Sequence, residues 1–135
     1  MKLYQYEISP FAHKVRSALQ YKNIPFDVVN INLLDSLLGR VKRLSSRAKL
    51  PLLEDEEKKV FVPDSSDIIA YLDERFPDKP LLPQDPFLRA QVMMMDDWAD
   101  EVLYFYELYF RLVAKEYRAH WIKEVSKNDI WPLRL

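Results

Sequence analysis

The sequence predicts an α/β fold, with elements in the order βαβαββα followed by an incomplete all-α segment. Short apolar runs rich in β-branched residues alternate with stretches whose apolar residues recur at helical spacing. A stretch with four prolines, residues 77–86, then interrupts the pattern. Beyond it, apolar residues recur at helical spacing from residue 88 to about residue 119, which predicts one long helix.

The first three elements are a strand, a helix and a second strand. Residues 3–8 form the first apolar run, and Ser9-Pro10 follows it directly. Serine is favoured at the N-cap of a helix and proline at its first position, so we expect the helix to begin here. Its buried stripe contains Val15, Ala18, Leu19 and Lys22. Pro25 ends the helix, and the β-branched run 26–31 predicts the second strand.

The next elements are a weak helix, a hairpin and a capped helix. Residues 33–44 are weakly helical and are interrupted by Gly39. The runs 52–54 and 60–62 flank a charged turn, which predicts an antiparallel hairpin. Asp64 then precedes an amphipathic segment that ends near Phe76.

We therefore expect three parts. Residues 1–76 form the α/β domain, residues 77–85 a semi-rigid linker, and residues 86–135 a partial α-helical domain. The last part has only about 50 residues, too few to bury both faces of a long helix. It must dock on the first domain or on a partner.

Composition excludes several classes of function. The net charge of −1, from 20 basic and 21 acidic residues, is too small to recruit nucleic acid or an anionic membrane. The absence of cysteine excludes disulfides and thiolate metal ligands, and two histidines argue against a metal site. A single glycine excludes a glycine-rich phosphate loop. With neither a signal peptide nor a membrane-spanning run in the sequence, we expect a cytoplasmic protein.

Ser9-Pro10 is the most informative dipeptide. A strand that runs into it places the serine hydroxyl at a helix N-terminus, where backbone N–H groups and the helix dipole favour an anion such as a thiolate. The alternative is that Ser9 only caps the helix, which contributes about 1 kcal/mol. The two roles are compatible.

Three motifs in register resemble the glutathione transferase family. They are Ser-Pro-Phe-Ala-His-Lys-Val-Arg at 9–16, Lys-Leu-Pro-Leu-Leu at 49–53, and Asp-Ser-Ser-Asp-Ile-Ile-Ala-Tyr-Leu at 64–72. The resemblance covers the family's thioredoxin-like N-terminal domain, and residues 96–101 resemble the start of its helical domain. That helical domain normally has at least four helices. With one or two, this chain resembles a truncated or minimal member.

The resemblance implies that the protein binds reduced glutathione and activates its thiol for attack on a small electrophile. Ser9 would donate a hydrogen bond to the glutathione sulfur and favour the thiolate. Tyr4 and Tyr6 are rival hydroxyls on the first strand, although the Ser-Pro register favours Ser9. Because neither Ser9 nor Ala12 carries a thiol, disulfide exchange is excluded.

The resemblance also assigns the glutathione-binding residues. A cis bond between Leu50 and Pro51 would leave the Leu50 backbone to pair with the cysteinyl unit, and Lys49 would meet the glycyl carboxylate. Asp64 and Ser65 would hold the γ-glutamyl end. The alternatives are an edge-strand proline at position 51, a solvated lysine at 49, and a plain capping box that joins Asp64 to Asp67.

Aromatic residues are abundant on the predicted long helix. Their excess implies an acceptor-substrate pocket, a homodimer contact, or both. We place the electrophile against Phe11, Trp98 and Tyr106. The leading hypothesis is thus a glutathione transferase-like protein. The alternative is a non-catalytic thioredoxin-fold module for protein interaction, and a third possibility is an intertwined oligomer.

Overall fold

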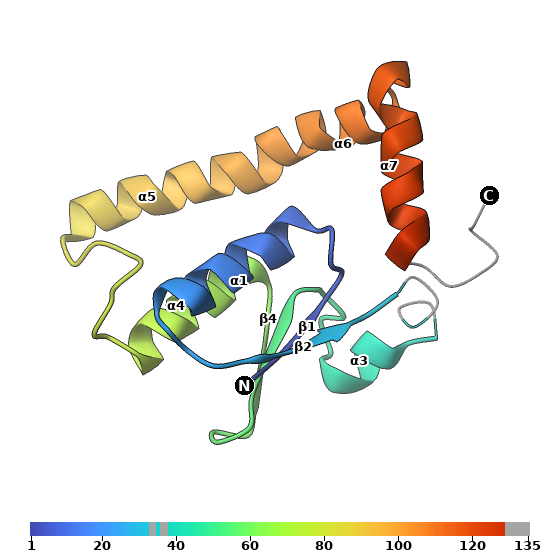
Figure 1. Ribbon diagram of the computed structural model, residues 1–135. Coiled ribbons are helices and arrows are strands. Elements are labelled where there is room, and N and C mark those ends of the chain that lie inside the picture. The colour runs from blue at the N-terminus through green and yellow to red at the C-terminus, as the bar shows by residue number, and fades with distance from the viewer. Residues whose placement is uncertain (33–34, 36–37, 129–135) are drawn as a thin grey trace. The chain divides into compact units, whose positions relative to one another are not determined.

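The computed structural model describes residues 1–32, 35 and 38–128. The chain divides into two compact units, Met1–Leu81 and Leu82–Leu135. The elements of the first unit are β1 (Lys2–Gln5), α1 (Pro10–Tyr21), β2 (Asp27–Asn30), α3 (Arg40–Leu44), β3 (Leu52–Asp55), β4 (Val60–Pro63) and α4 (Ser65–Arg75) (Figure 1). The predicted order is confirmed. Of the helix expected over residues 33–44, residues 33, 34, 36 and 37 lie outside the described residues.

The four strands form one sheet in the order β2-β1-β3-β4. β1 pairs with β2 in parallel and with β3 antiparallel, and the expected β3–β4 hairpin is present. Leu52 on β3 lies opposite both Tyr4 on β1 and Pro63 on β4. The carboxyl ends of β1 and β4 therefore meet the amino end of β3 at one end of the sheet.

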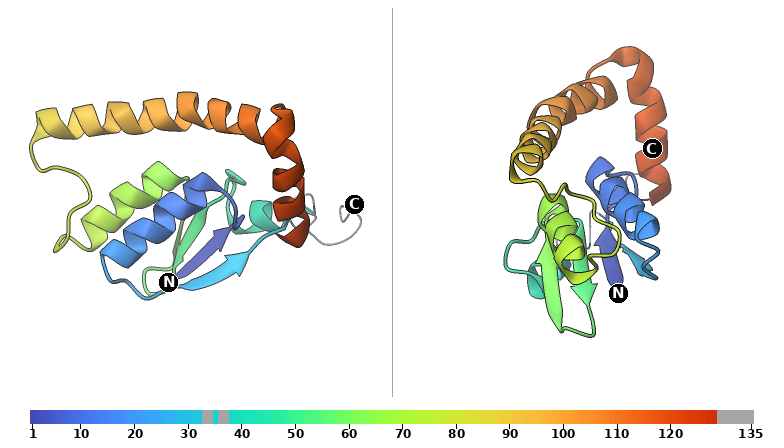
Figure 2. Two further views of the ribbon diagram at one scale, coloured as in Figure 1. Left: turned by 45° about the horizontal axis from the view of Figure 1, so that its top comes forward. Right: turned by 90° about the vertical axis from the view of Figure 1, so that its left-hand side faces the viewer.

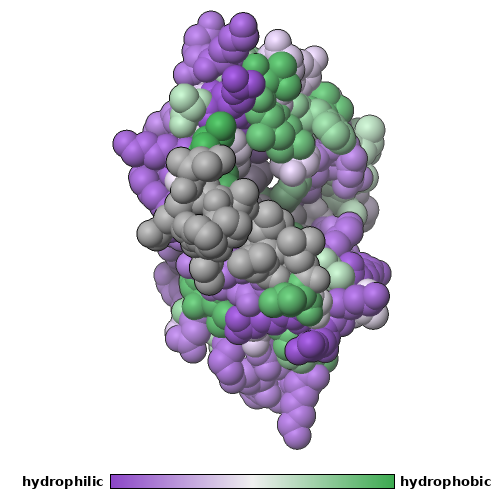
Figure 3. Space-filling model, turned by 90° about the vertical axis from the view of Figure 1, so that its right-hand side faces the viewer, coloured by the Kyte–Doolittle hydropathy of each residue, from purple (hydrophilic) through white to green (hydrophobic). Residues whose placement is uncertain are grey.

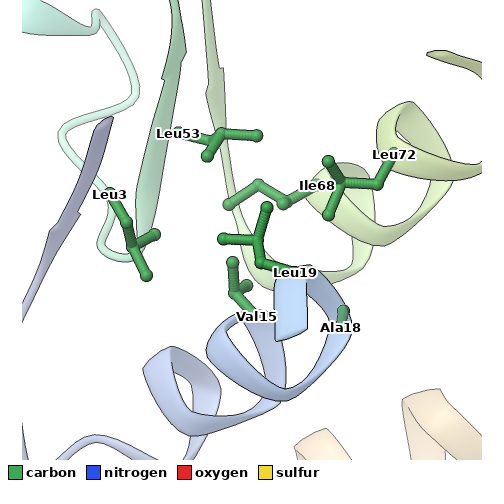
Figure 4. Packing of buried hydrophobic residues seen from close by; sticks show 7 residues of the cluster. All are labelled: Leu3, Val15, Ala18, Leu19, Leu53, Ile68 and Leu72. Atoms are coloured by element: carbon green, nitrogen blue, oxygen red, sulfur yellow. The ribbon is translucent and has the colours of Figure 1, made fainter. Parts of the chain in front are cut away.

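Helices α1 and α4 lie side by side against one face of the sheet (Figures 1 and 2). The core between these layers is apolar: Leu3, Val15, Ala18, Leu19, Leu53, Ile68 and Leu72 (Figure 4). Each large aliphatic side chain buried here stabilises the fold by about 1.5 to 3 kcal/mol. The buried stripe expected on α1 is confirmed.

Lys22, the charged member of that stripe, is also buried. Its Nζ lies 2.7 Å from Oδ1 of Asp73 and donates to the carbonyls of Phe76 and Lys79, at 2.8 and 2.7 Å. The Asp73 carboxylate in turn accepts the Leu81 N–H at 2.8 Å. The pair thus fastens the segment that follows α4 to the end of α1.

A buried carboxylate also organises the turn of the hairpin. Asp55 is only 2% exposed and accepts the backbone N–H groups of Glu57 and Lys58. It accepts the hydroxyl of Tyr71 at 2.6 Å as well. Burial and this hydrogen bond raise the pKa of Tyr71 to about 12. The sequence showed only a charged turn here.

The second unit is helical. It comprises α5 (Pro86–Trp98), a π-helical turn η1 (Ala99–Leu103), α6 (Tyr104–Leu112) and α7 (Lys115–Asn128). The expectation of one helix to about residue 119 is wrong, because α6 ends at Leu112 and η1 interrupts the run before it. Neither the π-helical turn nor the end of α6 contains a proline or a glycine, and the apolar periodicity continues across both. The sequence therefore contains no signal of either interruption. None of the helices in the described ranges is long and apolar enough to cross a membrane.

Candidate functional site

The sheet brings three predicted site segments together at the end where β1 and β4 finish and β3 begins. Ser9 follows β1, Leu50 and Pro51 precede β3, and Asp64 follows β4. Because Leu52 pairs with Tyr4 and with Pro63, these segments leave or enter the sheet at that same end. Residues 9, 50 and 64 are far apart in sequence, and the sheet topology makes them neighbours.

Ser9 is the N-cap of α1, as expected. Its backbone is extended, its N–H donates to the Tyr6 carbonyl at 3.0 Å, and its carbonyl accepts from the N–H of His13 at 3.0 Å. Within the part of the chain that the structure describes, its side chain makes no capping hydrogen bond. The alternative in which the hydroxyl serves to cap the helix is therefore wrong. The hydroxyl lies at the positive end of the α1 dipole and accepts no hydrogen bond from the backbone N–H groups of the first turn, which lies within the described residues.

The peptide bond between Leu50 and Pro51 is cis, as expected. Pro51 is buried, and its carbonyl accepts the Asp64 N–H at 3.2 Å. Since Pro51 leads into β3, an inner strand of the sheet, the edge-strand alternative is wrong. Among the described residues, the backbone hydrogen bonds outside helices and strands include none to Leu50. Its N–H and C=O can therefore pair with an added extended chain.

Asp64 caps α4 and binds Lys49. Its Oδ1 accepts the Ser66 N–H at 3.1 Å, and its Oδ2 lies 3.0 Å from Nζ of Lys49. Asp67, the expected partner in a capping box, pairs instead with Arg47 at 2.7 Å. The prediction that Asp64 caps α4 is therefore confirmed, and the prediction of a reciprocal capping box with Asp67 is wrong. Asp64 also has a φ of 77°, in the left-handed region that few residues other than glycine adopt.

Several neighbours hold the Asp64 carboxyl in its ionised form. Burial alone would raise its pKa, but the hydrogen bonds from Lys49 and from the Ser66 N–H outweigh burial, and Lys14 adds a favourable charge. The net result is a pKa below the ordinary value of 3.8. At neutral pH the site thus presents a carboxylate that can pair with an ammonium group.

Replacing Asp64 by asparagine should remove the charge and keep the cap, since asparagine is an equally good N-cap. We expect the variant to be less stable by about 1 kcal/mol or less at neutral pH. Because the folded-state pKa is lowered, the contribution is present above pH 3.8 and lost as the pH falls through that lowered value. Urea unfolding of both proteins across this range measures it.

Asp67→Asn is the matched control, because Asp67 is exposed and pairs with the exposed Arg47. A gap between wild type and Asp64→Asn that stays constant down to the lowest pH would contradict the assignment.

Ser65 and Lys14 complete the surroundings of the α4 N-terminus. Ser65 is 3% exposed at the first position of α4. Nζ of Lys14, on α1, donates to Oγ of Ser66 at 3.1 Å and so joins the starts of the two helices. Lys14 was missed from the sequence, although it lies inside the 9–16 motif. Only the packing of α1 beside α4 reveals its place.

The three predicted electrophile contacts are distributed over both units. Phe11 is half-buried on α1, and Trp98 is exposed at the end of α5. Tyr106 lines a groove of about 400 Å³ on α6, together with Phe105, Tyr109 and Phe110. Trp98 is not among the described residues that line this groove. On the face that Figure 3 draws, hydrophobic residues lie exposed among hydrophilic ones.

The sheet order, the two helices on its face and the cis proline before β3 define a thioredoxin-like domain followed by a helical segment. Residues 3–80 match the family model described as the N-terminal domain of glutathione S-transferase. The chain belongs to the glutathione S-transferase family.

Individual relatives agree with this assignment. The chain is 40% identical over 92 residues to glutathione S-transferase Z1 of Arabidopsis thaliana, a match that covers 67% of this chain and 41% of that protein. It is 36% identical over 89 residues to a probable maleylacetoacetate isomerase of Caenorhabditis elegans, covering 65% and 41%. The match thus spans less than half the length of these relatives.

A solved structure extends the likeness to the helical unit. The glutathione S-transferase of Methylobacterium radiotolerans in complex with glutathione sulfonate superposes with a TM-score of 0.70 at 28% identity. The superposition covers 94% of this chain and 62% of that one.

Proposed function

We propose that this protein binds reduced glutathione and activates its thiol for attack on an electrophilic carbon. The observation that carries the proposal is Ser9, whose hydroxyl lies at the N-terminus of α1 and does not cap it. The Leu50 backbone and the Asp64 carboxylate stand at the same end of the sheet. A relative named as a glutathione S-transferase and a solved relative that holds glutathione sulfonate support it.

In this proposal glutathione lies extended along the amino end of β3. The Leu50 N–H and C=O pair with its cysteinyl unit as a neighbouring strand would. The ammonium of the γ-glutamyl unit pairs with Asp64, and its carboxylate meets the Ser65 hydroxyl and the N-terminus of α4. Lys49 meets the glycyl carboxylate in this proposal by releasing Asp64, whose charge the γ-glutamyl ammonium then balances.

Ser9 then acts on the sulfur. A thiol in water has a pKa of about 8.5, and a helix N-terminus with one hydrogen-bond donor lowers it toward neutrality. The thiol proton leaves to solvent, and the thiolate attacks the electrophile. With an activated chloroarene, a carbon–sulfur bond forms and chloride departs.

Titration calorimetry with reduced glutathione tests the proposal. We expect binding with release of a proton, seen as a heat that depends on the ionisation enthalpy of the buffer. S-methylglutathione, which keeps the peptide and lacks the thiol proton, should bind without that release. Glutathione at a hundred times its Kd should stabilise the fold by about 2.7 kcal/mol. Absence of heat and of stabilisation at millimolar glutathione would contradict the proposal.

A second candidate function is a non-catalytic module for protein interaction. It is favoured by the helical unit, in which none of the described residues of α5, η1 and α6 is buried. This candidate predicts a folded protein that ignores glutathione in the same titration. We also propose that the protein is a cytoplasmic homodimer, and light scattering at several concentrations tests the oligomeric state.

A further inference from the structure

Arg16 lies on α1 two turns after Ser9, and its side chain reaches back to the end of β1. Its Nη1 donates to Oε1 of Gln5 at 2.6 Å and to the Glu7 carbonyl at 3.2 Å. Gln5 is the last residue of β1, and Glu7 lies in the segment that leads to Ser9. One guanidinium group therefore holds this segment at two points.

The Gln5 side chain is itself fixed. It is 2% exposed, and a buried amide must have its hydrogen bonds satisfied. Its oxygen accepts from Arg16, and its nitrogen donates to Oδ1 of Asn30 on β2 at 3.0 Å. Its backbone carbonyl accepts the N–H of Ile31 at 2.7 Å. The Gln5 side chain is thus held in one orientation, and it fixes the position of the Arg16 guanidinium group.

The turn from residue 6 to residue 9 determines where the Ser9 hydroxyl lies. The Ser9 N–H closes a turn on the Tyr6 carbonyl at 3.0 Å, and Glu7 lies within that turn. Because the Ser9 side chain makes no capping hydrogen bond in the described structure, the backbone of this turn and of α1 sets its position. Displacement of the turn displaces the hydroxyl.

We propose that Arg16 is a positioning residue for thiol activation. It holds the turn from residue 6 to residue 9 so that the Ser9 hydroxyl meets the glutathione sulfur. The inference rests on the proposed function and adds the residue through which Ser9 is aligned. A misplacement of about 1 Å can lower a rate by up to a hundredfold. Lysine at position 16 would keep the charge, but its side chain is one bond shorter and its ammonium rotates freely.

A double-mutant cycle of Arg16→Lys and Ser9→Ala tests this role. We measure kcat, the KM for glutathione and the pH profile of kcat/KM with a chlorodinitrobenzene as electrophile. In the wild-type background, Arg16→Lys should lower kcat about tenfold and move the profile to higher pH. The KM for glutathione should change by less than about twofold. In the Ser9→Ala background, Arg16→Lys should lower kcat no further.

Arg75→Lys is the matched control, because the Arg75 guanidinium pairs with Asp55 and Glu57, away from Ser9. It should leave the pH profile unmoved. If Arg16→Lys fails to fold, Asn30→Ala replaces it, since Asn30 is exposed and its loss frees the Gln5 amide nitrogen and removes a 3.5 Å hydrogen bond to the Glu7 carboxylate in the same turn. That variant should show a smaller change in the same direction.

The possible results separate the two proposals. An equal loss from Arg16→Lys in both backgrounds, or no loss in either, overturns the role of Arg16 alone. A wild-type protein that does not bind glutathione, or binds it without releasing a proton, overturns the proposed function and this inference with it.

Discussion

Replacement of Ser9 by alanine is expected to lower the rate of glutathione conjugation about a hundredfold at neutral pH. The variant loses the one hydroxyl donor proposed to stabilise the thiolate, so less of the bound thiol is ionised. Its rate should recover as the pH rises toward about 8.5, where a thiol ionises without help. Steady-state kinetics over this range measure both effects.

The same variant should unfold with nearly unchanged free energy, within about 0.5 kcal/mol of wild type. The reason is that the Ser9 side chain caps nothing among the described residues. Ser17→Ala, at an exposed serine on the same helix, is the control and should change neither quantity. An unchanged rate together with a loss of about 1 kcal/mol would instead favour capping.

Replacement of Lys22 by methionine is expected to lower the free energy of unfolding by about 3 to 5 kcal/mol. The side chains of Lys22 and Asp73 are only 1% and 8% exposed, so removal of one leaves the other charge buried. The carbonyls of Phe76 and Lys79 also lose their donor. Urea denaturation measures the loss.

Arg47→Met is the matched control, because the Arg47–Asp67 pair has the same 2.7 Å separation but is 62% and 55% exposed. It should lower stability by less than about 1 kcal/mol. The double variant Lys22→Met with Asp73→Leu should recover only the part of the loss that comes from the unpaired Asp73 charge, because the two carbonyls and the Leu81 N–H still lack their partners. A loss from Lys22→Met no larger than that from Arg47→Met would contradict the assignment.

Local signals in the sequence predicted most of the first unit. Ser9-Pro10 marked the start of α1, the charged turn marked the hairpin, and helical spacing placed Lys22 in the buried stripe. These features depend on near neighbours in the chain. The break after Leu112 was missed, because it has no proline or glycine and apolar residues continue through it.

Contacts between residues far apart in the chain could not be predicted from the sequence. The spacing that buried Lys22 did not name Asp73 as its partner, because the packing of α1 beside α4 brings them together. For the same reason the sequence did not identify the ion pair of Lys49 with Asp64, and Lys49 was predicted only to bind the glycyl carboxylate of a ligand. Arg16 and Gln5 also meet only when β1 and α1 are folded against each other.

The buried Lys22–Asp73 pair has a mechanical consequence. The hydrogen bond from the Leu81 N–H to Asp73, together with the Asp73–Lys22 pair, ties the chain at Leu81 to the carboxyl end of α1. Ser9 stands at the other end of that helix, about 18 Å away for a helix of 12 residues. The point at which the chain leaves the first unit is therefore fixed at the end of α1 opposite Ser9.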